Sequence, residues 1–162
     1  MNQNPTLKIS DLEVGNNEDI INHSLQNFEA VEGRTIQFDF NNKTIVSGKT
    51  DNIDALKAVL EEKNFDVIIF GTARAGEECR FMMLDYLIEY NPLNLAIFQG
   101  LEDDLTNDYF NQLKNSGFEN NLVILKNCNE IIEFIKNNDF KTIFIGGNGQ
   151  QRISDIVNSL LS

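Results

Sequence analysis

The stretch DVIIFGTARAGEECRFMMLDYLIEY, residues 66–90, contains one complete strand-to-helix unit. Its continuous apolar run at 66–70 is typical of a strand that is covered on both faces of a sheet. Apolar residues at helical spacing fill 77–90, and Pro92 then disfavours helix at the residue before it. A turn of small residues, GTARAG, lies between the two at 71–76. Open α/β sheets bind their ligands at turns of this kind, beyond the carboxyl ends of the strands.

The same unit recurs from residue 43 to residue 162. The predicted strands are 43–48, 66–70, 95–98, 122–125 and 142–145. The predicted helices are 52–65, 77–90, 104–117, 129–138 and 151–161, with Gly117 as a C-terminal capping residue. This alternation predicts one α/β domain over 1–162, in which 43–162 form a mainly parallel five-stranded sheet with helices on both faces.

Residues 1–42 break the rhythm and are interpreted as an N-terminal extension packed on the sheet. We expect a short helix over 17–28, while TIQFDF at 35–40 alternates apolar and polar residues like a half-buried strand. The asparagine pair at 41–42 suits a hairpin turn back into 43–48. That hairpin conflicts with the flavodoxin-like strand order 2-1-3-4-5, which flanks the first strand on both sides. Either TIQFDF lies elsewhere or the strand order is different.

Composition excludes several classes of function. The net charge is −12, from 13 basic and 25 acidic residues, which disfavours binding to nucleic acid or to an anionic membrane surface. No apolar run approaches the roughly 20 residues of a membrane helix, and the first residues lack a signal-type segment, so we expect a cytoplasmic protein. With only His23, Cys79 and Cys128 as soft ligands, neither a zinc site nor a cysteine–histidine nucleophile is supported, and no cofactor is predicted.

The sequence VSGKTD at 46–51 ends like a phosphate-binding P-loop. The full motif requires a glycine five residues before Gly48, and Lys43 stands there instead. The motif is therefore absent. We interpret this stretch as a strand-to-helix turn in which Thr50 or Asp51 caps the next helix.

Two glycine-rich turns carry the candidate ligand-binding residues. These residues are Gly71, Thr72, Arg74 and Gly76 in the first turn, and Gly146, Gly147, Asn148, Gly149 and Arg152 in the second. Glycine lets a ligand approach the backbone, a helix N-terminus favours an anion, and arginine binds phosphate or carboxylate. Against this, Glu77 and Glu78 would repel an anion, and Ala73 breaks a GxGxxG pattern. Both turns therefore also fit plain connections.

Charged residues add two observations. Five of the basic residues follow predicted strands directly or lie in the next first turn, which hints at an anionic ligand at the carboxyl edge of the sheet; they are Lys49, Arg74, Arg80, Lys126 and Arg152. Glu102, Asp103 and Asp104 carry oxygen ligands of the kind that Mg²⁺ prefers. Acidic residues before a helix are more simply explained by its dipole, so no metal site is predicted.

The spacing of the five units resembles that of receiver domains of bacterial signalling, over about residues 43–161. The positions that carry receiver chemistry read Ser47-Gly48, Gln99-Gly100, Lys126-Asn127 and Gly146-Gly147 in this chain. Receiver domains have acidic residues after the first strand, an aspartate after the third, a serine or threonine after the fourth and a lysine after the fifth. At each of these four places, this chain has a different residue. The resemblance therefore implies a receiver-like or flavodoxin-like shell without that activity.

The sequence offers no convincing set of acid–base or nucleophilic residues. We therefore expect a non-catalytic regulatory or binding domain that recognises a protein partner, with an anionic small ligand at the carboxyl edge. The alternative is a small enzyme for a phosphorylated or nucleotide-like substrate, held by the two glycine-rich turns with Glu77 or Asp103 as acid–base group. A third hypothesis is self-association through the apolar helix at 77–90.

Overall fold

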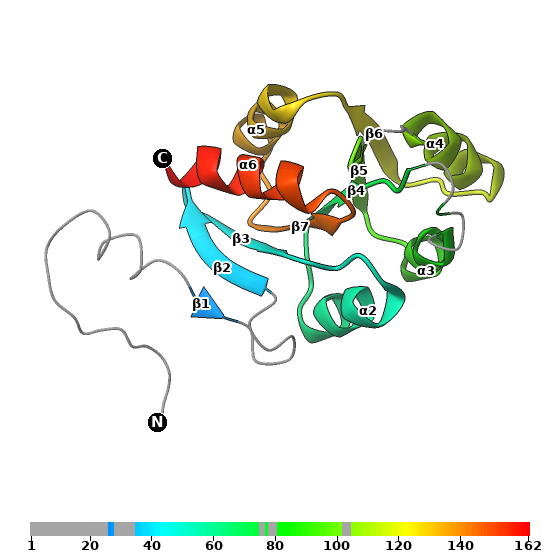
Figure 1. Cartoon of the computed structure of the whole chain (residues 1–162), viewed down its shortest axis with the longest axis horizontal. Coiled ribbons are helices and arrows are strands. Elements are labelled where there is room, and N and C mark those ends of the chain that lie inside the picture. The colour runs from blue at the N-terminus through cyan, green and yellow to red at the C-terminus, as the bar shows by residue number, and fades with distance from the viewer. Residues whose placement is uncertain (1–25, 28–34, 75–76, 78–80, 102–104) are drawn as a thin grey trace, which may run out of the picture.

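The computed structural model describes residues 26–27, 35–74, 77, 81–101 and 105–162. The strands are β1 Gln26–Asn27, β2 Thr35–Phe40, β3 Lys43–Gly48, β4 Val67–Gly71, β5 Asn94–Phe98, β6 Asn121–Leu125 and β7 Thr142–Gly147. The helices are α2 Ile53–Glu62, α3 Phe81–Tyr90, α4 Thr106–Asn115, α5 Cys128–Asn137 and α6 Gln150–Leu161. Figure 1 shows these elements as one α/β unit.

The described strands form one seven-stranded sheet in the order β1-β2-β3-β7-β4-β5-β6. The five strands from β3 to β6 in this order are parallel, and β1 and β2 add an antiparallel pair at one side. The predicted α/β fold, with a parallel five-stranded core inside a flavodoxin-like shell of helices, is confirmed. Its strand order differs from 2-1-3-4-5, because the last strand, β7, lies between the first two strands of the rhythm.

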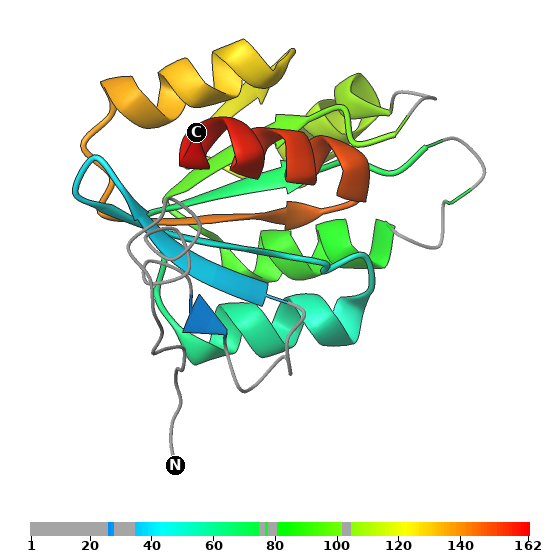
Figure 2. The same ribbon diagram turned by 60° about the vertical axis from the view of Figure 1, so that its left-hand side comes forward.

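The helices divide between the two faces of the sheet. Residues of α2, α3 and α4 pack into one apolar core, and residues of α5 and α6 pack into a second core on the opposite face. Figure 2 shows α5 and α6 on one side of the sheet and α2 and α3 on the other. Right-handed crossovers explain the sides of α2 to α5, since the chain steps in one direction from β3 to β6 and then returns to β7. α6 follows β7 and packs beside α5.

The predicted hairpin exists and settles where residues 35–40 lie. Asn41 and Asn42 have φ of 50° and 64°, the left-handed pair that a two-residue hairpin turn requires. β3 is the outermost parallel strand, so its free edge accepts β2. Gln26 and Asn27 lie in β1 rather than in the helix expected over 17–28, because they pair with β2. The rest of that predicted helix falls outside the described residues.

The ends of the helices follow local capping chemistry. Asn52, not Thr50 or Asp51, caps α2, and its side-chain oxygen accepts a hydrogen bond from Ala55 N at 2.9 Å. Gly117 follows the end of α4 as predicted, with φ +86°, and Phe118 N donates a hydrogen bond to Leu113 O in the last turn of the helix. The described part of α3 is Phe81–Tyr90, and most residues of its predicted first turn lie outside the described part of the chain.

Candidate functional site

The turns after β3, β4, β5 and β7 meet at the carboxyl edge of the sheet. After β4 the chain enters α3 on one face, and after the adjacent β7 it enters α6 on the other face. Neighbouring strands whose connections leave in opposite directions create the crevice at which open α/β sheets bind ligands. The two glycine-rich turns predicted from the sequence are these two connections.

The glycines of these turns allow their backbones to pack directly against one another. Asn148 N donates to Gly71 O at 2.8 Å, and a Cβ atom on Gly71 would overlap the Asn148 carbonyl oxygen. A Cβ atom on Gly149 would overlap the carbonyl oxygen of Gly100, which follows β5. Close packing between turns therefore explains these glycines without a ligand, and this is the structural alternative that the sequence left open.

Buried hydroxyl groups form hydrogen bonds that hold these turns in place. Gly147 N donates to Thr50 Oγ1 at 2.8 Å, which explains why Thr50 follows β3 although it caps no helix. The Thr72 hydroxyl donates to Phe98 O at 3.1 Å and lies 3.1 Å from Thr106 Oγ1. Thr72 was a candidate ligand-binding residue, but its side chain is completely buried in this network.

A pocket of about 270 Å³ opens between these turns, and we call it the rim pocket. It is lined by Lys49, Asp51, Arg74, Glu77, Leu101, Gly147, Asn148, Gly149 and Gln150. It thus brings together four of the predicted residues: Arg74 from the first glycine-rich turn and Gly147, Asn148 and Gly149 from the second. Gly71 and Gly146 are buried and do not line it, and Gly76 lies outside the described residues.

The charges that line the rim pocket are balanced. Lys49 and Arg74 are basic, whereas Asp51 and Glu77 are acidic. Arg74 Nε lies 3.1 Å from Glu77 Oε2, and the arginine side chain is 56% exposed. The charge repulsion expected from Glu77 is therefore partly offset by its own arginine neighbour. An anion that enters this pocket must compete with Glu77 for Arg74.

The N-terminus of α6 gives the rim pocket its anion-binding character. Gly149 is the N-cap residue, with φ +87°, and it provides no side-chain oxygen to the first-turn N–H groups. No acidic residue lies in that first turn either. In contrast, α2 and α5 are capped by the side chains of Asn52 and Asn127. Within the described part of the chain, no side chain caps the first turn of α6, so its N–H groups can donate to an anion there.

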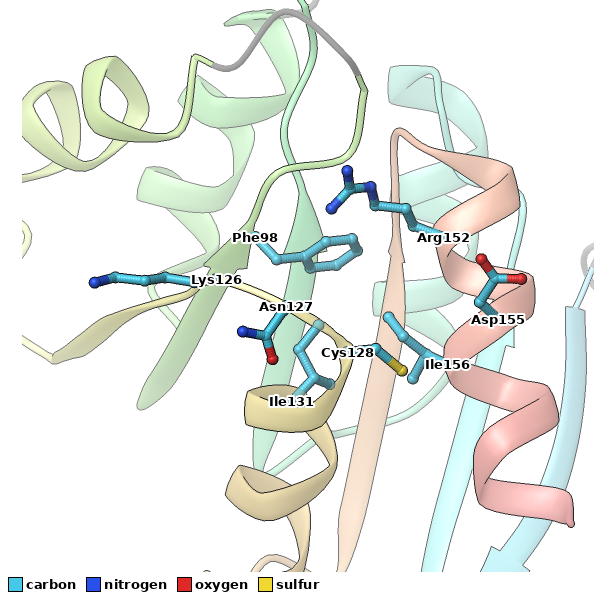
Figure 3. A pocket seen from close by; sticks show the side chains of 8 residues that line it. All are labelled: Phe98, Lys126, Asn127, Cys128, Ile131, Arg152, Asp155 and Ile156. Carbon is cyan, nitrogen blue, oxygen red and sulfur yellow. The ribbon is translucent and has the colours of Figure 1, made fainter.

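A second cavity, of about 250 Å³, lies between α5 and α6, and we call it the helix cavity (Figure 3). It is lined by Phe98, Lys126, Asn127, Cys128, Ile131, Arg152, Asp155 and Ile156. Arg152 therefore lines a different pocket from Arg74, and these two candidate residues do not share one site. Sequence reasoning missed the apolar lining residues, since periodicity marks them only as core.

The basic residues expected at the carboxyl edge divide between the two pockets. Lys49 and Arg74 line the rim pocket, whereas Lys126 and Arg152 line the helix cavity. The fifth, Arg80, lies outside the described residues.

No group of three or more histidine, cysteine, aspartate or glutamate side chains in the described ranges is placed to hold a metal ion. The acidic residues 102–104, together with His23 and Cys79, lie outside those ranges. Cys128 is a free, partly exposed thiol, and its Sγ lies 3.9 Å from Ser159 Oγ. The described part of the chain thus assembles no nucleophile–base pair around this cysteine.

Comparisons with models of protein families, with curated proteins and with solved structures found no match. None of the helices in the described residues has the length and apolar character to span a bilayer. Function is therefore inferred from the geometry of the two pockets.

Proposed function

We propose that this protein is a binding domain whose rim pocket holds a small anionic ligand. The observation that carries the proposal is the N-terminus of α6, which no side chain of the described residues caps and which opens into a pocket that also contains Lys49 and Arg74. Backbone N–H groups at such a terminus point toward an incoming anion, and the helix dipole favours negative charge there.

The size and charge of the rim pocket narrow the class of ligand. Its volume of about 270 Å³ is below the roughly 300–1,000 Å³ of pockets for drug-sized ligands, so a phosphorylated small molecule fits better than a dinucleotide. Because Arg74 is more than half exposed, its contact with an anion is screened by solvent and contributes modestly. Backbone N–H groups and Lys49 then supply the rest of the recognition.

Recognition of a protein partner has less support than the small-ligand function. Met82 and Leu93 are the large apolar side chains that are exposed in the described residues, at 58% and 71%. The apolar helix proposed for self-association mainly buries its residues against the sheet and neighbouring helices, including Met83, Leu84 and Leu87. We therefore place the function in the rim pocket rather than on a protein-binding face.

A thermal-shift screen with inorganic phosphate, AMP, glucose 6-phosphate and FMN tests the proposal. A ligand at a hundredfold excess over its Kd stabilises the fold by about 2.7 kcal/mol, which corresponds to a Tm rise of about 5–10 °C for a chain of this size. The Lys49→Gln and Arg74→Gln variants should reduce the rise.

Lys141→Gln is the matched control, because Lys141 is exposed and immediately precedes β7 at the opposite edge of the sheet. It removes the same charge as Lys49→Gln. If no compound raises Tm at millimolar concentration, or if the rise survives both rim substitutions, the rim pocket is not the site.

One observation favours a second candidate function, an enzyme for a phosphorylated or nucleotide-like substrate. Gly147 and Gly149 line the same pocket as Arg74, as expected if the two glycine-rich turns hold one phosphate. Glu77 is the acid–base residue expected there, and its Oε2 lies 3.1 Å from Arg74 Nε. Saturable turnover of a compound found in the screen, abolished by Arg74→Gln, would favour the enzyme over the binding domain.

A further inference from the structure

The helix cavity has a composition that the rim pocket lacks, an apolar floor beneath a basic mouth. We propose that it is a second and separate binding site, for a small carboxylic acid with an apolar body, either aliphatic or aromatic. This site is a different pocket from the rim pocket, and the proposal does not depend on the function proposed for that pocket.

The floor consists of side chains that are otherwise core residues. Phe98 from β5, Ile131 from α5 and Ile156 from α6 are 2%, 2% and 1% exposed, and all three line the cavity. Figure 3 shows the isoleucine side chains and the Phe98 ring facing a common space between the two helices. An apolar group placed there leaves water, which contributes about 25 cal/mol per Å² of buried apolar surface.

The mouth of the cavity favours an anion. Lys126, Arg152 and Asp155 are the charged residues that line the cavity. Figure 3 shows Arg152 reaching from α6 past the Phe98 ring, whereas the Lys126 side chain points away from the cavity. Arg152 is therefore the residue placed to receive the anionic group.

Local hydrogen bonds leave this arginine available. The Asp155 carboxylate accepts a hydrogen bond from Gln151 Nε2 at 3.0 Å, and no residue in the described ranges forms an ion pair with Arg152. A carboxylate matches the planar fork of a guanidinium group and accepts two parallel hydrogen bonds from it. A ligand with this head group and an apolar body uses both parts of the cavity.

Phenylacetate is a suitable probe, with phenylacetamide and acetate as controls that lack the charge or the apolar body. We expect saturable binding of phenylacetate in isothermal titration calorimetry, and binding about tenfold or more weaker for both controls. Amide chemical shifts of the uniformly ¹⁵N-labelled chain should change at Cys128, Ile131 and Ile156. Absence of phenylacetate binding would overturn the proposal, as would shifts confined to the turn at 147–149.

Arg152→Gln tests the role of the guanidinium group, and Arg74→Gln is its matched control in the rim pocket. Arg152→Gln should weaken phenylacetate about tenfold and leave phenylacetamide unchanged, whereas Arg74→Gln should leave both unchanged. Equal affinity in the wild type and Arg152→Gln would remove this residue from the site. An effect of Arg74→Gln alone would move the carboxylate to the rim pocket.

A substitution in the wall tests the apolar part of the cavity. Cys128 is half-buried, so the larger side chain of Cys128→Met should enter the cavity and compete with the phenyl ring. If that variant does not fold, protection of the Cys128 thiol from iodoacetamide by phenylacetate decides instead, in a Cys79→Ser background. A thiol that reacts at the same rate with and without phenylacetate would contradict the proposal.

Discussion

Replacing Gly149 by alanine tests whether the glycine-rich turns exist to pack against each other. Gly149 has φ +87° and Gly117 has φ +86°, so an alanine at either position is forced into the same left-handed conformation. That conformation costs about 1–2 kcal/mol for a residue with a Cβ atom. The two positions differ in space, because a Cβ at 149 would overlap the Gly100 carbonyl, whereas nothing lies within 4 Å of a Cβ at 117.

The difference between the two variants isolates the packing between turns. Overpacking adds about 1–3 kcal/mol, so Gly149→Ala should lower the free energy of unfolding by about 2–5 kcal/mol and Gly117→Ala by about 1–2 kcal/mol. In urea denaturation, with a slope of about 2 kcal/mol per M, the two midpoints should differ by about 0.5–1.5 M. Equal midpoints for the two variants would refute the inference that backbone contact between the turns explains the glycine at 149.

Three further changes have expected outcomes. Thr50→Val removes the acceptor of the buried Gly147 N–H and should lower the free energy of unfolding by about 1–3 kcal/mol. Thr50→Ser keeps a hydroxyl acceptor and should retain most of the wild-type stability. Chemical denaturation distinguishes the two variants. The Lys43 ammonium group donates to Asn138 O at 2.7 Å and to Phe140 O at 3.2 Å, both in the segment after α5. Lys43→Met removes both hydrogen bonds and should lower the free energy of unfolding by a similar amount in the same assay. Burial raises the pKa of Tyr90 above its usual 10.0, and burial, followed by the Glu61 charge, raises the pKa of Tyr86. The folded chain holds these tyrosine protons more tightly than the unfolded chain does. Their contribution to the free energy of unfolding is therefore complete below about pH 10 and is lost as the pH rises further. The ultraviolet tyrosinate titration of Tyr90→Phe should therefore lack a group that titrates above pH 10; loss of a group that titrates near pH 10 would contradict this assignment.

From residue 35 onward, local signals in the sequence were sufficient for the elements of the fold. The strand predicted at 66–70 is observed as β4, Val67–Gly71, whose five residues are all buried, as expected of a strand covered on both faces. The asparagine pair at 41–42 and Gly117 adopt the left-handed conformations that their turns require. Each of these predictions depends on a few neighbouring residues, and tertiary contacts did not override them.

Non-local features could not be predicted in the same way. The rhythm of strands does not encode which strands pair, so the insertion of β7 beside β3 was not predicted. The separation of Arg74 from Arg152 follows from that topology, since α3 and α6 leave the adjacent strands toward opposite faces. The capping role expected of Thr50 was wrong because its hydroxyl bonds to a turn 97 positions away in the sequence.

The central place of β7 constrains the order in which this chain can fold. Its neighbours β3 and β4 precede it in the chain, and they are joined in the sheet only through β7, which is made after β5 and β6. Until residues 142–147 emerge, the two strands present open edges, and pairing across such long sequence separations slows folding. The sheet is therefore completed only after β7 is made, and until then the open edges of β3 and β4 are exposed to pairing with other strands.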